Sequence, residues 1–275
     1  MFVACLGMLA VGCSSITPPS PEKVFADRQD PEQVSYSLAD GGTLSGRVIG
    51  ASEGPLVLFV HGSPGGWNDF AHLLANRSLA DQARLVSVDR PGWGDSANLS
   101  VRPSLDAQVE ALQAVLDAHS EQLPALVVGH SYGGPVAALL AMEEPERVGG
   151  LILVAGSIDP KLEKTTWFQK VSRWSLVRWM LPDALVDADR EIQPLKEQLQ
   201  ELMPRWGELR MPVTVIQGEA DDLVPPANAD FAEERITGAT PLTVTRVPDM
   251  GHLIPWNRPE LVAEAVEEWL ADAAR

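Results

Sequence analysis

The amino-acid sequence predicts an α/β fold, with a mostly parallel sheet and helices on both of its faces. Strand-like and helix-like segments alternate along most of the 275 residues, as they do when helices connect parallel strands. Some strand segments are uninterrupted apolar runs, such as Leu56–Val60 and Leu151–Val154, which is typical of strands covered on both faces. A hydrophobic content of 45% is enough for one large core.

The predicted elements begin with a hairpin. Residues 34–38 and 43–49 are strand-like, and Asp40-Gly41-Gly42 between them is a turn signal. The next segments are a strand at 56–60, a helix at 67–80, a strand at 85–88 and a helix at 104–119. Later segments are a strand at 151–154, a strand at 213–216, a helix from 227, a strand at 242–247 and a helix from 259.

The alternation stops between residues 159 and 210. This stretch is helix-compatible and contains the large aromatic residues Trp167, Phe168, Trp174, Trp179 and Trp206. We expect residues 159–210 to form a helical lid over the C-terminal edge of the sheet. Residues 34–158 and 211–275 would then form the core of the domain.

The stretch from residue 125 to residue 140 contains the main candidate for a reactive side chain. An apolar strand, Ala125–Val128, leads into Gly129-His130-Ser131-Tyr132-Gly133, and a helix-like run follows. A Gly-x-Ser-x-Gly sequence between a strand and a helix indicates a nucleophile elbow, a sharp turn that exposes the serine hydroxyl. We predict that Ser131 is a catalytic nucleophile.

A serine nucleophile needs a base, and the base needs a carboxylate that orients it. His252 is one of five histidines and the one that follows the last strand, in a glycine-containing loop, so it is the predicted base. Asp221 follows the strand at 213–216 by a short turn and is the preferred acid. Asp222 and Asp159 are the alternatives, and either has an ordinary loop or capping role open to it.

Hydrolysis through an acyl-enzyme also needs hydrogen-bond donors for the developing oxyanion. The backbone amide of Tyr132 adjoins the nucleophile, and that of Ser63 lies in the tight loop after the strand at 56–60. We predict that these two amides form the oxyanion hole.

Five ordered motifs resemble those of the α/β-hydrolase family. They are His61-Gly62-Ser63-Pro64-Gly65, Asp89-Arg90-Pro91-Gly92-Trp93-Gly94-Asp95-Ser96, Gly129-His130-Ser131-Tyr132-Gly133-Gly134, Gly218 to Pro225, and Gly251-His252. The resemblance covers about residues 34–275 and implies the triad Ser131, Asp221 and His252, with no cofactor. Because position 131 is Ser, the resemblance disfavours an aspartate-nucleophile epoxide hydrolase or haloalkane dehalogenase.

Residues 1–33 resemble the tail of a bacterial lipoprotein signal followed by a polar tether. Met1–Gly12 is apolar and uncharged, and small residues precede Cys13. The apolar run is too short to span a bilayer. The resemblance implies a lipid on Cys13 and attachment to a membrane of the bacterial cell envelope, with the cytoplasm as the alternative location.

Charge and cysteine content exclude several other classes of function. A net charge of −17 disfavours a nucleic-acid partner, because an acidic surface repels phosphates. Cys5 and Cys13 are the only cysteines, so the sequence offers neither a disulfide framework nor a Cys/His metal-ligand spacing. We therefore expect a small-molecule substrate and no metal.

The leading prediction is a serine hydrolase that cleaves a small or medium, apolar carboxylic ester through an acyl-enzyme. Trp167 and Trp174 recur at helical spacing and are predicted to bind the apolar part of the substrate, with packing onto the sheet as their alternative role. The same triad also suits a proline iminopeptidase-like aminopeptidase, a C–C bond hydrolase or a perhydrolase. A surface binding lipoprotein without turnover is the alternative from another class.

Overall fold

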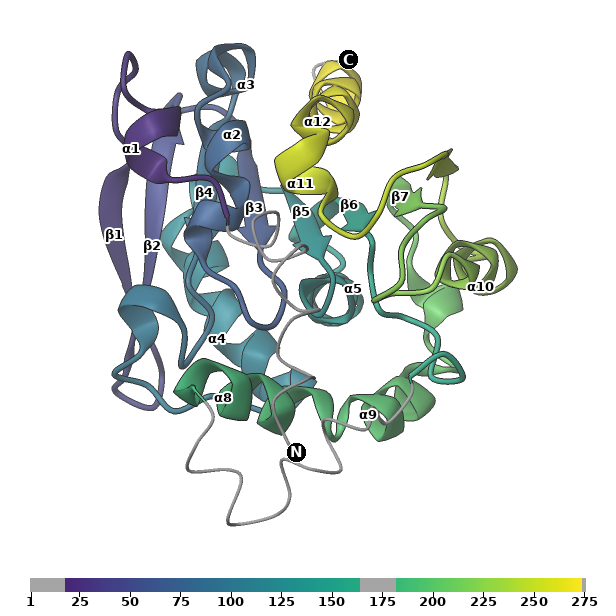
Figure 1. Ribbon diagram of the computed structural model, residues 1–275. Coiled ribbons are helices and arrows are strands. Elements are labelled where there is room, and N and C mark those ends of the chain that lie inside the picture. The colour runs from purple at the N-terminus through teal and green to yellow at the C-terminus, as the bar shows by residue number, and fades with distance from the viewer. Residues whose placement is uncertain (1–17, 164–181, 274–275) are drawn as a thin grey trace, which may run out of the picture.

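The computed structural model describes residues 18–163 and 182–273. Within them an eight-stranded sheet is packed between helices (Figure 1). The strands are β1 (Glu32–Ser37), β2 (Thr43–Gly50), β3 (Leu56–Val60), β4 (Arg84–Val88), β5 (Ala125–His130), β6 (Val148–Val154), β7 (Val213–Gly218) and β8 (Leu242–Val247). Their order in the sheet is β1-β2-β4-β3-β5-β6-β7-β8.

The sheet is parallel except at one edge. β1 pairs antiparallel with β2, and β2 pairs antiparallel with β4. All later neighbours, from β4 and β3 to β7 and β8, pair in parallel. The predicted α/β fold with a mostly parallel sheet is therefore confirmed, and so is the opening hairpin.

Helices cover both faces of this sheet. They are α1 (Pro21–Val24), α2 (Ala71–Leu74), α3 (Arg77–Gln82), α4 (Leu105–Ala118), α5 (Gly133–Glu143), α8 (Asp183–Ile192), α9 (Leu195–Leu202), α10 (Ala227–Arg235), α11 (Ile254–Asn257) and α12 (Pro259–Ala273). Leu58 of β3 joins a buried cluster with residues of α4 and α5, whereas its neighbour Phe59 joins a cluster with residues of α2, α3 and α12. Successive side chains of a strand point to opposite faces, so each face has its own core.

The predicted helix at 67–80 is wrong in its continuity. The structure has a 3₁₀ turn at Trp67–Phe70, then α2, then α3. The break comes at Asn76, whose side-chain oxygen accepts a hydrogen bond from the amide of Leu79 at 3.4 Å and caps a new helix. Asparagine competes for backbone donors in this way, which favours a helix start over a helix interior.

The segment predicted to be a polar tether is partly packed onto the domain. Phe25, directly after α1, is 3% exposed and joins the core cluster of α2 and α12. The Arg28 guanidinium donates a hydrogen bond to the carbonyl of Ala75. Cys13 lies outside the described residues, so the lipid on it stays a prediction.

The second part of the predicted lid is helical and lies at one end of the sheet. Figure 1 shows α8 and α9 next to α4, and Gln198 of α9 accepts a hydrogen bond from the amide of Leu105 at 2.6 Å. Trp206, which follows α9, is fully buried against Phe231 of α10, with the ring centroids 5.5 Å apart. Trp167 and Trp174 lie outside the described residues, and their role stays a prediction.

Candidate active site

Ser131 lies in a strained turn between β5 and α5. Its φ angle is 56°, a left-handed value that costs a residue with a side chain about 1–3 kcal/mol. A Cβ atom at Gly129 would lie 2.3 Å from the carbonyl oxygen of Gly133, and one at Gly133 would lie 2.2 Å from that of Val60. Glycine is therefore required at both positions, because the turn brings the backbone of β5, α5 and β3 into direct contact.

Backbone hydrogen bonds hold Ser131 in this conformation. Its amide donates to the carbonyl of Val154 at the end of β6, at 3.0 Å, and its carbonyl accepts from the amides of Gly134 and Ser157. These bonds tie the serine to the next strand on one side and to the first turn of α5 on the other. The surrounding fold thus supports the strained φ angle.

His252 and Asp221 form a hydrogen-bonded pair. His252 Nδ1 lies 2.8 Å from Asp221 Oδ2, and Asp221 is only 4% exposed. An ionised carboxylate only accepts hydrogen bonds, so Nδ1 carries the proton and Nε2 is left as the basic nitrogen. The other carboxylate oxygen, Oδ1, accepts from the amides of Leu223 at 2.9 Å and Val224 at 2.8 Å.

The two alternative carboxylates are placed differently. Asp222 is exposed. Asp159 accepts a hydrogen bond at Oδ1 from the amide of Lys161, at 2.8 Å, and so stabilises its own loop. Among the three candidates that the sequence left open, Asp221 is the carboxylate that contacts His252.

His130, the last residue of β5, supports the loop that carries His252. Its ring lies 4.8 Å from the ring of His252. Its Nε2 donates to the backbone carbonyl of His252 at 3.1 Å. Burial, followed by the nearby His252, lowers the pKa of His130 to about 3, so this imidazole is neutral at any pH where a histidine base works. Its role is to position the loop, and the sequence offered no signal for it.

Ser131 and His252 are brought to the same edge of the sheet but are not directly bonded. Among the described residues, no hydrogen bond joins Ser131 Oγ to His252. The two are linked through His130, which precedes the serine and packs on the histidine. Catalytic hydrogen bonds are often long in unliganded structures and shorten when substrate binds.

The loop after β3 lies against the serine. A Cβ atom at Gly62 would be 3.0 Å from Ser131 Cβ and 3.4 Å from Ser131 Oγ, so the absence of a side chain lets the loop approach. In the described part of the chain, the amides of Ser63 and Tyr132 donate to no protein acceptor. The loop that carries Ser63 and the residue Tyr132 thus both adjoin the nucleophile, and the role of their amides as oxyanion donors stays a prediction.

Two functional candidates beyond the predicted set come from a buried ion pair. Arg90, in the loop after β4, and Glu191, on α8, are both fully buried and pair at 2.8 Å. Arg90 belongs to the motif at residues 89–96, which the sequence analysis identified. Glu191 had no such signal, because it is one charged residue among many on an amphipathic helix.

Asp69 is a buried carboxyl group beneath the loop after β3. Burial raises its pKa to about 7, and Asp89 acts in the same direction, whereas the Gly66 amide and Arg90 lower it. The native carboxyl group therefore keeps its proton between about pH 4 and pH 7, where an unfolded aspartate has lost it. The free energy of unfolding falls as pH rises through this window.

Asp69→Asn is expected to remove this pH dependence. Each pKa unit corresponds to about 1.4 kcal/mol, so the stability of the variant relative to the wild type should rise by up to roughly 4 kcal/mol between pH 4 and pH 7. Urea denaturation at a series of pH values measures the difference. Asp81→Asn, a substitution at an exposed position, controls for the loss of one carboxyl group. Parallel stability curves for Asp69→Asn and the wild type would show that the carboxyl group is ionised throughout.

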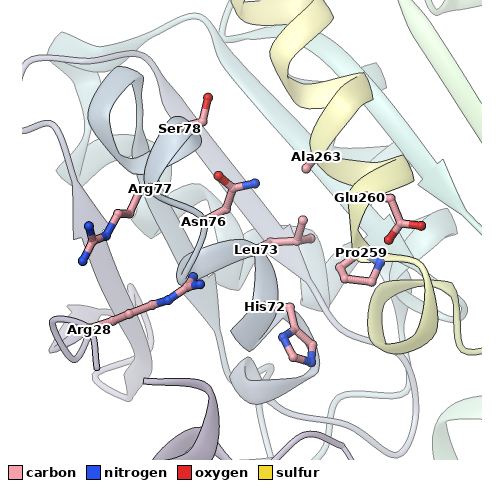
Figure 2. A pocket seen from close by; sticks show the side chains of 9 residues that line it. All are labelled: Arg28, His72, Leu73, Asn76, Arg77, Ser78, Pro259, Glu260 and Ala263. Atoms are coloured by element: carbon pink, nitrogen blue, oxygen red, sulfur yellow. The ribbon is translucent and has the colours of Figure 1, made fainter. Parts of the chain in front are cut away.

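A cavity of about 430 Å³ lies away from this site, between α2, α3 and the start of α12 (Figure 2). Its walls include His72, Asn76, Arg77 and Glu260, and none of the predicted site residues lines it.

Within residues 18–163 and 182–273, no cluster of three or more potential ligands for a metal ion occurs. Of the helices in the same residues, none is long and apolar enough to cross a membrane.

Comparison with known proteins identifies a family model that matches most of the chain and curated relatives that match part of it. The sequence model of the alpha/beta hydrolase family matches residues 57–265. The chain is 33% identical over 127 residues to an sn-1-specific diacylglycerol lipase from Mus musculus. The aligned region covers 45% of this chain and 37% of the lipase. It is also 33% identical over 102 residues to epoxide hydrolase B from Mycobacterium tuberculosis. This aligned region covers 36% of this chain and 28% of the epoxide hydrolase. These matches span less than two fifths of each relative's own length.

A solved structure covers more of the chain at lower identity. An esterase from Thermogutta terrifontis has a TM-score of 0.65 and 21% identity, over 88% of this chain and 98% of the esterase. At that identity the similarity shows the fold alone.

Proposed function

The chain belongs to the alpha/beta hydrolase family, and we propose that it is a serine hydrolase that cleaves a small or medium, apolar carboxylic ester. One observation carries the proposal: Ser131 occupies a strained turn at the sheet edge that also holds the hydrogen-bonded pair His252–Asp221. A strained, partly exposed serine at the same sheet edge as an oriented imidazole has the parts that acyl transfer needs.

The proposed reaction has two halves. Ser131 Oγ attacks the ester carbonyl while His252 Nε2 takes the hydroxyl proton, and the oxyanion accepts hydrogen bonds from the Ser63 and Tyr132 amides. The tetrahedral intermediate collapses, the alcohol leaves with the proton from His252, and the acyl group stays on Ser131. Water then attacks the acyl-enzyme while His252 Nε2 takes one of its protons. The second tetrahedral intermediate collapses, the carboxylic acid leaves, and the proton passes from His252 to Ser131 Oγ.

An ester substrate is favoured by chemistry and by one relative. One relative that matches part of this chain is named a diacylglycerol lipase, and diacylglycerol is a carboxylic ester. Esters also have better leaving groups than amides and need no further residue beyond the triad and the oxyanion donors. Aminopeptidase, C–C bond hydrolase and perhydrolase activities use the same triad, and the aminopeptidase is one outcome of the test below.

The test combines a covalent probe with a substrate series. One equivalent of a fluorophosphonate is expected to label the wild-type protein on the peptide that contains Ser131. With p-nitrophenyl esters, kcat/KM should rise from acetate to butyrate or hexanoate, by up to about fourfold per methylene, because each buried methylene contributes about 0.8 kcal/mol. Faster release of p-nitroaniline from amino-acid anilides would assign a peptidase instead, and a protein that neither labels nor hydrolyses any ester would refute the proposal.

A further inference from the structure

Arg90 lies between the two predicted oxyanion donors and α8. Its Nη2 donates to the carbonyl oxygen of Gly62 at 2.7 Å, and its Nε donates to the carbonyl of His61 at 3.0 Å. Its guanidinium carbon is 4.7 Å from the centre of the Tyr132 ring. One fully buried side chain therefore contacts the loop after β3 and the residue that follows the nucleophile.

The contact with Gly62 acts on the amide of Ser63, because the Gly62 carbonyl and the Ser63 N–H belong to the same planar peptide group. Holding the carbonyl oxygen in place therefore fixes the direction in which the Ser63 N–H points. A carbonyl that accepts strong hydrogen bonds is also polarised, which makes the N–H of its peptide group a better donor.

His61 gives the same peptide group a second fixed partner. The backbone N–H of Arg90 donates to His61 Nε2 at 2.9 Å, so Nε2 must be an acceptor and the proton of the neutral ring lies on Nδ1. That Nδ1–H donates to the Gly62 carbonyl at 2.7 Å. Burial and the Arg90 charge hold the pKa of His61 well below its usual value, which keeps the ring neutral. Both acceptor positions of the Gly62 oxygen are thus occupied.

Glu191 of α8 fixes the guanidinium in turn. Its two carboxylate oxygens accept from Arg90 Nη1 at 2.8 Å and from Nη2 at 3.0 Å. Oε1 also accepts from Trp93 Nε1 at 3.1 Å and from Gln108 Nε2 at 2.9 Å. This bidentate arrangement, with further donors on the carboxylate, restricts the geometry of the buried ion pair.

We propose that Arg90 and Glu191 are positioning residues that hold the Gly62–Ser63 peptide in the orientation that oxyanion binding requires. The inference rests on the proposed function, since it assumes that the Ser63 amide is an oxyanion donor. The geometry of the oxyanion hole then depends on α8, whose Glu191 is 101 residues away from Arg90 in sequence.

Arg90→Lys tests the geometry without removing the charge. A lysine has no planar fork and cannot bond Gly62 and Glu191 as Arg90 does. We expect kcat for a p-nitrophenyl ester to fall about 10- to 100-fold, as for a misplaced transition-state donor, while KM changes less than threefold. A trifluoromethyl ketone, whose adduct with Ser131 carries an oxyanion, should lose affinity by the same factor as kcat/KM.

The double variant Arg90→Met/Glu191→Leu separates positioning from stability. Replacing both charges by apolar groups leaves no unpaired buried charge, so this variant is expected to fold even where a single substitution does not. If the pair positions the donor, the double variant stays as impaired in kcat and inhibitor affinity as Arg90→Lys. Leu79→Ala, a core truncation on α3 outside the site, controls for a general loss of stability and should keep the wild-type kcat.

Two results would overturn the inference while leaving the proposed function intact. One is an Arg90→Lys variant with wild-type kcat and inhibitor affinity. The other is a double variant whose activity returns to the wild-type level, which would make the pair a purely structural contact. A wild-type protein that does not react with fluorophosphonate would instead refute the proposed function itself.

Discussion

Ser131→Ala is expected to lower kcat for the best p-nitrophenyl ester by roughly 10⁶-fold, as loss of the nucleophile does in serine proteases, and to abolish labelling by fluorophosphonate. Without Oγ no acyl-enzyme forms, and the residual rate comes from substrate binding and the oxyanion donors alone. Stopped assays over hours measure the residual rate, and intact mass measures the label.

The control for this variant is a measurement of its stability, which shows whether the fold is intact. Alanine has the same Cβ as serine at the strained φ of 56°, so the strain of the turn is unchanged and the thermal unfolding midpoint should be close to that of the wild type. Labelling of Ser131→Ala to the same extent as the wild type would place the reactive group elsewhere and end the assignment of Ser131.

Asp221→Asn is expected to lower kcat by about 10⁴-fold, as the corresponding change does in serine proteases. The amides of Leu223 and Val224 both donate to Oδ1, so the oxygen of an asparagine would stay on that side. Its NH₂ group would then face His252 Nδ1 as a donor. This moves the ring proton to Nε2, which can no longer accept the proton of Ser131.

The other two aspartates are the matched controls. Asp159→Asn and Asp222→Asn make the same chemical change at carboxylates that form no hydrogen bond with His252 among the described residues. Each should retain kcat within about threefold, because the orientation of the imidazole is unchanged. A severe defect in Asp159→Asn, together with a nearly normal Asp221→Asn, would identify Asp159 as the acid. Comparison of all three under one assay decides between them.

Local sequence rules were enough for the order of the elements and for the elbow. Apolar runs and turn residues act over a few positions, so the strands from β3 to β8 were found with small errors at their ends. The requirement for glycine at 129 and 133 follows from a turn that a five-residue motif encodes. The prediction of one continuous helix at 67–80 is wrong because the side chain of Asn76 caps a new helix, α3, instead of continuing the one before it.

Contacts between distant segments were decided by the tertiary structure alone. The sequence favoured Asp221 but left its neighbour Asp222 open, and the path of the turn after β7 decides between them by burying Asp221 2.8 Å from His252. The role of His130 depends on the arrival of the His252 loop from 122 residues away. Glu191 of α8 pairs with Arg90 across 101 residues of sequence. Short-range patterns do not encode such pairings, because a side chain's partner is set by which loops the parallel sheet brings to the same edge.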